Sequence, residues 1–369
     1  MATSSLQKHG GLLLRAFPPP AYLTMPAAGI DMSDYSIKHV LLKRKGSRVV
    51  LASYGKVDLP LGTIEQGEIK DHETLVKLLS RVRKEHGYEH IQLSLPEEHA
   101  YLFQTTIPEG SSAEMEHQLE FHLKENVPFG ANEAVFDYNV ISTSTEGKKL
   151  NVSVYPVTIA SDYVEAVEEA GFKPLSVEVE GQATARALLR PNQTAPTLII
   201  DLGRNQAGLS ISVGGMVTFT ANLETGGDVL TRAIARGMDV SFQEAERLKR
   251  EYGFTNTKES ELVYKVLKPA VSDIMESINK HLAYWRMHAR AAGDKASEVS
   301  RVILVGGNAN LEGLTEYLET GLGVEVVVGN VWENVFVFDE YIPAINANQS
   351  LEFATAVGLA LRSLMRSSS

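Results

Sequence analysis

The sequence of 369 residues contains no cysteine. Disulfide bonds and thiolate metal sites are therefore excluded, and a reducing compartment is compatible with the composition. Long apolar runs are missing as well. The early run Leu12-Leu13-Leu14 is much shorter than a signal-peptide core or the roughly 20 residues that span a bilayer. We therefore expect neither a leader nor a transmembrane segment.

An excess of positive charge is also missing. Lys and Arg number 35 against 46 acidic residues, which gives a net charge of −11. A general nucleic-acid binder usually carries a basic face, so this function class is not expected. The length exceeds that of an ordinary single domain, and 44% apolar residues suffice to bury a core in each part. The sequence therefore predicts a globular protein of several domains.

One layout occurs twice along the chain. Residues 197–201 (TLIID) form a short apolar run that ends in Asp201, and two alternating stretches then flank Gly214-Gly215. This pattern predicts a buried strand followed by a hairpin. Residues 29–31 again end in an aspartate, Asp31, followed by a polar turn and a second predicted hairpin around residues 45–47. Two such lobes would hold a polyphosphate and its Mg²⁺ between a pair of turns and aspartates.

Two further elements favour a nucleotide site. Gly226-Gly227-Asp228 opens a predicted helix, whose N-terminus attracts anions, and Gly306-Gly307-Asn308 follows the predicted strand 301–305. Ser241 and Glu244 form a predicted capping box, which places Glu246 and Lys249 on one helix face. The residues alone leave simpler interpretations open: ordinary turns, and a solvated ion pair between Glu246 and Lys249. Amphipathic spacing also predicts helices over residues 71–86, 273–292 and 351–365.

Five segments, taken in order, resemble the nucleotide-site motifs of actin-like ATPases. The five segments are Asp31 to Lys38, Asp201-Leu202-Gly203, residues 226–235, residues 244–249 and residues 305–314. Among these ATPases the chain is most similar to the type IV pilus assembly protein PilM family, relatives of FtsA, over nearly everything after about residue 20. The resemblance implies an α/β, actin-like fold with two duplicated, ribonuclease H-like lobes and an inserted small α+β subdomain.

The resemblance also implies domain boundaries. The short apolar run and the three prolines within residues 1–27 predict an extended N-terminal arm, and the resemblance predicts a second lobe over 197–349. The first lobe would comprise residues 28–94 together with 179–196 and a closing helix over 350–366. The inserted subdomain would occupy residues 95–178.

By the same resemblance, Asp31 and Asp201 would approach Mg²⁺ and a further set of residues would bind ATP. That set is Ser33, Ser36, Lys38, Gly203, Arg204, Asn205, Gly226, Gly227, Glu246, Lys249, Gly306, Gly307, Asn308 and Leu311.

Two departures from the family pattern weaken the expectation of catalysis. Ser33 stands where such proteins commonly have a glycine in the first loop, and Asp34 adds a carboxylate beside the phosphates. In the second loop Ala207 stands at the usual threonine position, while Arg204 adds a compensating cation. Gln206 and Glu224 are weak candidates for orienting an attacking water. We therefore expect ATP binding with slow or absent hydrolysis.

The function implied by the resemblance is that of a nucleotide-binding scaffold. Such a protein would lie in the cytoplasm, peripheral to the inner membrane, and would dock a cytoplasmic peptide of a PilN-like membrane protein in a groove beside the insertion. Self-association is possible. Two alternatives stay open at this stage: an active ATPase or small-molecule kinase, and an FtsA-like filament or division protein.

Overall fold

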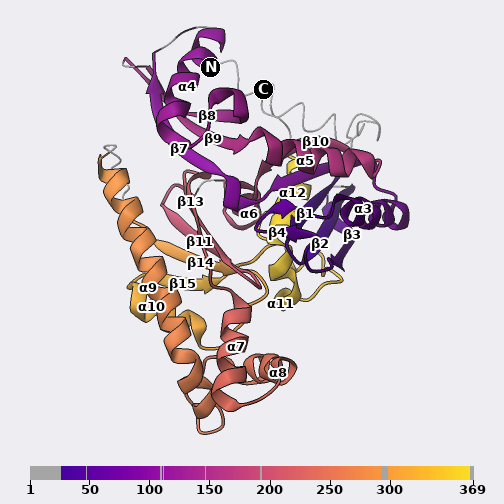
Figure 1. Ribbon diagram of the computed structural model, residues 1–369, viewed down its shortest axis with the longest axis vertical. Coiled ribbons are helices and arrows are strands. Elements are labelled where there is room, and N and C mark those ends of the chain that lie inside the picture. Colours follow the sequence, from indigo (N-terminus) through magenta and orange to yellow (C-terminus); the bar gives the residue numbers. More distant parts are fainter. Residues whose placement is uncertain are drawn as a thin grey trace.

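The computed structural model of the protein describes residues 26–46, 48–108, 110, 112–145, 147–191, 193–291 and 298–365. Almost all of the predicted N-terminal arm lies outside this part of the chain. Two five-stranded sheets, one three-stranded sheet and one two-stranded sheet organise the described residues (Figure 1).

The first five-stranded sheet has the order β10-β6-β1-β2-β3. Its strands are β1 (Ala27–Ser33), β2 (Ser36–Lys45), β3 (Arg48–Asp58), β6 (His90–Leu95) and β10 (Lys173–Val179). The second has the order β13-β12-β11-β14-β15. Its strands are β11 (Thr197–Leu202), β12 (Ala207–Val213), β13 (Met216–Leu223), β14 (Arg301–Val305) and β15 (Glu325–Val328).

The two sheets share one topology. In each, the first strand pairs antiparallel with the strand that follows it and parallel with a later strand on its other side. Both first strands are almost completely buried, as expected for central strands covered on both faces. The predicted glycine turn between β12 and β13 is confirmed, since Gly214 and Gly215 have φ angles of 61° and 83°. The predicted internal duplication is therefore confirmed.

Helices cover both sheets. α3 (His72–His86) and α5 (Val157–Glu169) contribute to the core of the first sheet. α7 (Gly227–Met238), α8 (Phe242–Tyr252), α9 (Glu261–Ala291) and α10 (Leu314–Leu322) contribute to the core of the second. α9 begins well before the predicted residue 273, and Pro269 lies inside the helix.

Between the sheets lie α6 (Glu180–Leu188) and α12 (Ala354–Arg362). Two glycines allow close packing here, Gly358 between α6 and α12 and Gly29 between β1 and α12. A Cβ on Gly358 would lie 1.8 Å from the carbonyl oxygen of Ala183 on α6, and one on Gly29 of β1 would lie 2.1 Å from the carbonyl oxygen of Ala356 on α12. The predicted closing helix is less regular than expected, since α11 (Ala347–Ser350) and a 3₁₀ turn, η3 (Leu351–Phe353), precede α12.

A smaller body lies at one end of the molecule, at the top of Figure 1. Its sheet has the order β7-β9-β8, with β7 (Tyr101–Ile107), β8 (Ala134–Ser144) and β9 (Gly147–Pro156). Helix α4 (Ser112–Asn126) shares a separate core with it. Short elements complete the fold: β4 (Ile64–Glu65), β5 (Glu68–Ile69), η1 (Glu97–His99) and η2 (Ala131–Glu133).

The extent of this smaller body differs from the predicted insertion over residues 95–178. Strand β10 pairs with β6 in the first sheet, and Ile159 and Tyr163 of α5 pack in that sheet's core. Since α5 and β10 cover and extend the first sheet, we propose that the insertion comprises about residues 101–156. Across the described residues, no helix has both the length and the apolarity to cross a membrane.

Candidate functional site

A cleft of about 870 Å³ opens between the two lobes. The carboxyl ends of β1, β6 and β10 from one sheet and of β11 and β14 from the other lead into it, the usual position of ligands in sheets with parallel strands. The predicted site residues that line it are Asp31, Ser33, Ser36, Lys38, Asp201, Gly203, Arg204, Asn205, Gly227, Glu246, Lys249, Gly306, Gly307, Asn308 and Leu311. The structure therefore brings nearly all of them together.

Gly226 is the exception, because it does not line the cleft. A Cβ at Gly226 would lie 2.5 Å from the carbonyl carbon of Asn205 and 2.6 Å from the carbonyl oxygen of Arg204. The placement of Gly226 near the phosphates therefore stays a prediction, while the structure shows that this position packs against backbone. Its missing side chain lets the helix start pack against the back of the Arg204–Asn205 turn.

The two aspartates meet near Lys38. The Lys38 ammonium lies 3.2 Å from Asp31 Oδ2, and the Ser94 hydroxyl donates to Asp31 Oδ1 at 3.3 Å. Burial raises the pKa of Asp201 to about 6, with Lys38 acting in the opposite direction and Asp31 in the same one. Asp31 and Asp201 therefore share one electrostatic environment, as predicted from the doubled layout.

Two carboxyl groups in the cleft, those of the buried Glu97 and the half-buried Glu180, were not predicted. Burial raises the pKa of Glu97, on η1, to about 8, and raises that of Glu180, the first residue of α6, well above its usual value. The negative neighbours Glu98 and Asp201 add to both shifts, and Asp31 adds to that of Glu180. Each residue follows the carboxyl end of a strand parallel to β1, and this position was the sequence signal that could have revealed them.

Glu97 fits between the two lobes. Its Oε1 accepts a hydrogen bond of 2.9 Å from the Ser210 hydroxyl of β12. A Cβ on Gly181 would lie 2.8 Å from Oε1, and one on Gly208 would lie 2.8 Å from Oε2. Glycines from both lobes thus leave the space that the carboxyl group fills.

Arg204 connects the two phosphate-loop candidates. Its guanidinium lies over the ring of Tyr35, 4.6 Å from the centroid, and its Nε lies 3.2 Å from Asp228 Oδ1. Tyr35 belongs to the β1–β2 turn and Arg204 to the β11–β12 turn, so this contact crosses the cleft. The carboxylate of Asp34 accepts hydrogen bonds from the backbone N–H groups of Gln66 and Gly67, at 3.1 and 3.2 Å. The predicted repulsion of phosphate by Asp34 is weakened by these two donors.

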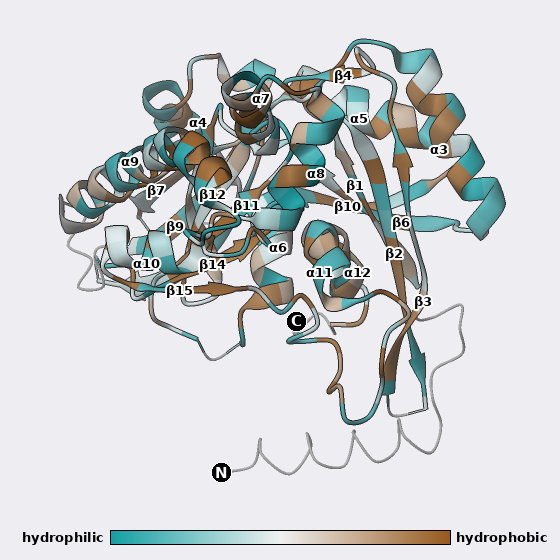
Figure 2. Ribbon diagram, turned by 90° about the horizontal axis from the view of Figure 1, so that it is seen from below, coloured by the Kyte–Doolittle hydropathy of each residue, from teal (hydrophilic) through white to brown (hydrophobic). Residues whose placement is uncertain are grey.

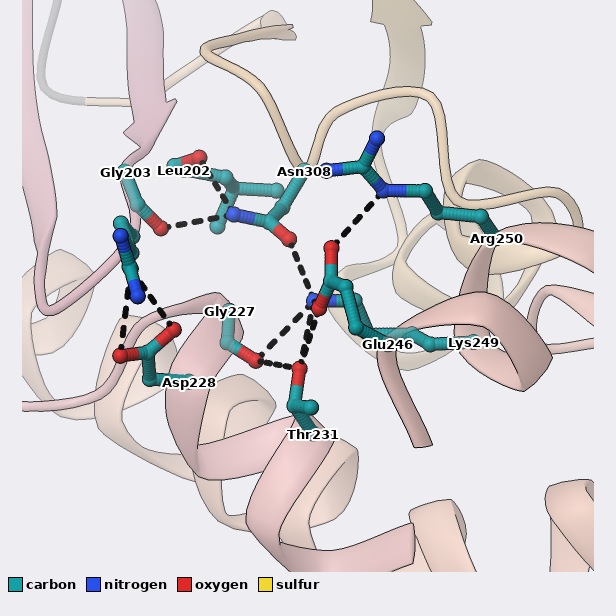
Figure 3. Close-up of polar contacts among 10 residues, drawn as sticks. Leu202, Gly203, Gly227, Asp228, Thr231, Glu246, Lys249, Arg250 and Asn308 are labelled. Carbon is teal, nitrogen blue, oxygen red and sulfur yellow. Dashed lines mark hydrogen bonds and ion pairs between the residues drawn. The ribbon is translucent and has the colours of Figure 1, made fainter. Parts of the chain in front are cut away.

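Lys249 is the centre of a polar network on the side of the second lobe (Figure 3). Its ammonium contacts Glu246 Oε2 at 2.8 Å, Thr231 Oγ1 at 2.8 Å and Asn308 Oδ1 at 3.1 Å. It also donates to the carbonyl oxygen of Gly227 at 3.1 Å. The Lys249 side chain is only 4% exposed, and burial lowers its pKa. The network joins α7, α8 and the turn after β14, so it positions the predicted ribose and base residues relative to one another.

Asn308 extends this network to the phosphate side. Its Nδ2 donates to the carbonyl oxygen of Gly203 at 2.8 Å (Figure 3). A Cβ on Gly227 would lie 2.2 Å from Asn308 Oδ1, so a glycine is needed for this approach. The loops after β11 and β14 and the start of α7 are therefore held as one unit at the cleft.

Comparison with known families agrees with this geometry. The family described as type IV pilus assembly protein PilM matches residues 29–364. The chain belongs to the PilM family. The match covers both lobes, the smaller body and every predicted site residue.

The similar proteins place the PilM family member among actin-like proteins. The cell division protein FtsA of Buchnera aphidicola is 21% identical over 199 residues, 47% of this chain and 48% of FtsA, so about half of that relative is matched. A solved PilM–PilN type IV pilus biogenesis complex has a TM-score of 0.76 and 23% identity, covering 92% of this chain and 99% of that one. MreB5 of Spiroplasma citri bound to ADP has a TM-score of 0.53 and 13% identity, covering 91% and 96%. The predicted actin-like fold is confirmed.

Proposed function

We propose that this PilM family member is a nucleotide-binding scaffold of the type IV pilus assembly machinery. It binds ATP with Mg²⁺ between its lobes and docks a cytoplasmic peptide of a PilN-like inner-membrane protein, which holds it at the inner face of that membrane. The observation that carries the proposal is the cleft, lined from both duplicated lobes, in a chain of this family. A volume of about 870 Å³ is in the range of small-molecule sites.

The donor set fits a nucleotide with a divalent cation. Burial raises the pKa values of Asp201, Glu97 and Glu180, so these carboxyl groups favour the protonated form unless a nearby cation stabilises their negative charge. Mg²⁺ prefers carboxylate and water oxygens, and when bound it would neutralise phosphate charge. Asp31 and Asp201 would hold it. The hydroxyls of Ser33 and Ser36 and the backbone of residues 203–205 would face the phosphates.

We expect binding rather than fast turnover. The side-chain amide of Gln206 donates a hydrogen bond to the Glu98 carboxylate, so it is engaged within the protein. Glu224 is exposed and does not line the cleft. We therefore expect neither of the two predicted candidates to orient an attacking water. Multiple turnovers by the purified protein would favour the ATPase alternative.

Titration calorimetry with ATP tests the nucleotide part of the proposal. We expect binding that strengthens with Mg²⁺, and a loss of at least about tenfold in affinity for Asp201→Ala with Mg²⁺ present. The control is Asp162→Ala, which removes an exposed carboxylate on α5. Equal affinity of Asp201→Ala and the unaltered protein would refute the assignment of the metal site. No heat at millimolar ATP would refute the nucleotide site as a whole.

The junction of the smaller body and the first lobe is our candidate for the peptide site. β8 is an edge strand, and its Val135 pairs with Tyr155 two residues before Val157, the first residue of α5. The two valines are 44% and 41% exposed. An extended peptide could add to the strand edge and cover these side chains.

Fluorescence anisotropy with a labelled N-terminal peptide of a PilN-like protein tests this site. Val135→Glu should weaken peptide binding strongly, because it places a charge in an apolar contact. Val328→Glu is a matched control, since Val328 is also 44% exposed and also lies on an edge strand, β15. If the two variants bind alike, the peptide docks elsewhere on the protein.

A further inference from the structure

The β2–β3 hairpin reaches beyond its sheet. The pairing of β1 with β2 ends at Gly29 and Val40, whereas β2 and β3 stay paired as far as Lys45 and Arg48. The far end of the hairpin accordingly projects from the body of the molecule (Figure 2). It therefore presents its side chains at the surface.

This end of the hairpin is strongly basic. Residues 43–48 read KRKGSR, four cations in six positions, in a chain whose net charge is −11. Lys43, Arg44, Lys45 and Arg48 are all exposed. Nη2 of Arg44 donates to the carbonyl oxygen of Leu364 at 3.2 Å, so the hairpin also contacts the segment after α12.

Exposed apolar side chains lie beside these cations. Residues 336–343 run along the hairpin, where the Tyr341 hydroxyl donates to the carbonyl oxygen of Leu51 at 3.3 Å. In this segment Val337 is 61% exposed, Phe338 46% and Ile342 82%. Met365, next to the residue that Arg44 contacts, is 44% exposed. Apolar side chains of this size rarely gather on a free surface without a partner.

The segment is positioned by contacts on its inner side. Phe336 packs against the core of the second sheet, and the centroid of its ring lies 4.8 Å from the centroid of the Tyr341 ring. Nη1 of Arg48 donates to the carbonyl oxygen of Glu340 at 3.3 Å, and its Nε lies 3.6 Å from Glu340 Oε2. These contacts hold the exposed apolar side chains next to the basic tip.

We propose that this basic–apolar edge, consisting of Lys43, Arg44, Lys45, Arg48, Val337, Phe338, Ile342 and Met365, binds the surface of an anionic phospholipid membrane. The segment also contains Asp339 and Glu340, so four cations stand against two carboxylates, one of which contacts Arg48. The cations are attracted to anionic headgroups, and the apolar side chains enter the boundary between headgroups and acyl chains. A chain with a net charge of −11 is otherwise repelled by such a surface, so the attraction depends on this local cluster.

Vesicle co-sedimentation of the full chain tests the proposal. We expect binding to vesicles that contain phosphatidylglycerol, weak binding to pure phosphatidylcholine, and a decrease with rising salt. Lys43→Gln with Lys45→Gln should weaken binding about 25-fold, since each basic residue contributes about fivefold at an anionic surface. Ile342→Ser should weaken it independently by removing an apolar contact.

A matched control removes the same charge elsewhere. Lys77→Gln with Lys84→Gln changes two exposed lysines of α3 and should leave vesicle binding unchanged. Equal binding by both double variants, or equal binding to charged and uncharged vesicles, would overturn the proposal. So would self-association that depends on Lys43 and Lys45 without vesicle binding, because the edge would then be a contact between copies. The result is independent of whether ATP or the peptide binds.

Discussion

Replacing Lys249 by methionine tests the network that holds one side of the cleft. Methionine keeps the apolar stem of the side chain but removes the ammonium. The change takes a donor from Thr231 Oγ1, from Asn308 Oδ1 and from the Gly227 carbonyl oxygen, and a counter-charge from Glu246. The side chain is 4% exposed, so water does not replace these contacts without rearrangement.

The expected loss of stability is about 2–3 kcal/mol. Removing one partner of a fully buried ion pair costs about 3–5 kcal/mol. Two features reduce this value. Glu246 is 28% exposed and also contacts Arg250 Nε at 2.8 Å, and burial already lowers the pKa of Lys249, which means that desolvation opposes its charge.

Urea unfolding followed by tryptophan fluorescence measures this loss. Trp285 and Trp332 both belong to the core of the second lobe, which also contains buried residues of α7 and α8. The control is Lys265→Met, which removes an exposed i,i+4 ion pair with Glu261 on α9 and should change stability by less than about 0.5 kcal/mol. If Lys249→Met changes the free energy of unfolding as little as the control does, the network does not stabilise the cleft.

Three more predictions follow from buried sites. Gly226→Ala should lower the free energy of unfolding by about 1–3 kcal/mol, since its Cβ would lie 2.5 Å from the backbone of Asn205. The control is Gly307→Ala, whose Cβ would have no neighbour within 4 Å and which should have little effect in the same urea assay. His39 is buried and has a pKa of about 4, below its usual value through burial and the nearby His86, so only the unfolded chain takes up a proton at mildly acidic pH. Stability should then fall by about 2 kcal/mol between about pH 7.5 and about pH 5, and His39→Phe should flatten this slope in urea titrations followed by circular dichroism. Glu97, with a pKa of about 8, holds its proton in the folded state, so its contribution is lost as pH rises from about 4.5 through 8. Glu97→Gln should remove that slope, and an unchanged pH profile in either variant would contradict the corresponding pKa shift.

The sequence predicted those parts of the fold that depend on local pattern. The β12–β13 hairpin was visible because Gly214 and Gly215 supply the positive φ angles that its turn requires. Asp31 and Asp201 were visible because each ends an apolar run, and the duplicated topology places both at one cleft.

What the sequence did not predict depends on packing between distant segments. β10 belongs to the first sheet because it pairs with β6, and α5 because it packs in that sheet's core, and neither contact leaves a mark in residues 157–179 alone. Glu97 was missed because its environment includes Ser210 and Gly208 of the second lobe, which are distant in sequence. α9 starts before the predicted residue 273 because Val263, Leu267 and Val271 pack in the core of the second sheet, so tertiary contacts support the helix around Pro269.

The route by which the chain enters the smaller body has a mechanical consequence. Directly after β6 the backbone passes through the cleft as η1, where Glu97 bonds to Ser210 of the opposite lobe, and farther along Asn151 donates to the carbonyl oxygen of Val217 at 2.8 Å. The smaller body is thus joined to the first lobe by the chain that leaves β6 and contacts the second lobe through Asn151. A change in the separation of the two lobes would therefore alter the contacts of Glu97 and Asn151 with the second lobe. Binding of a partner to the smaller body would in this way be coupled to the distance between the lobes.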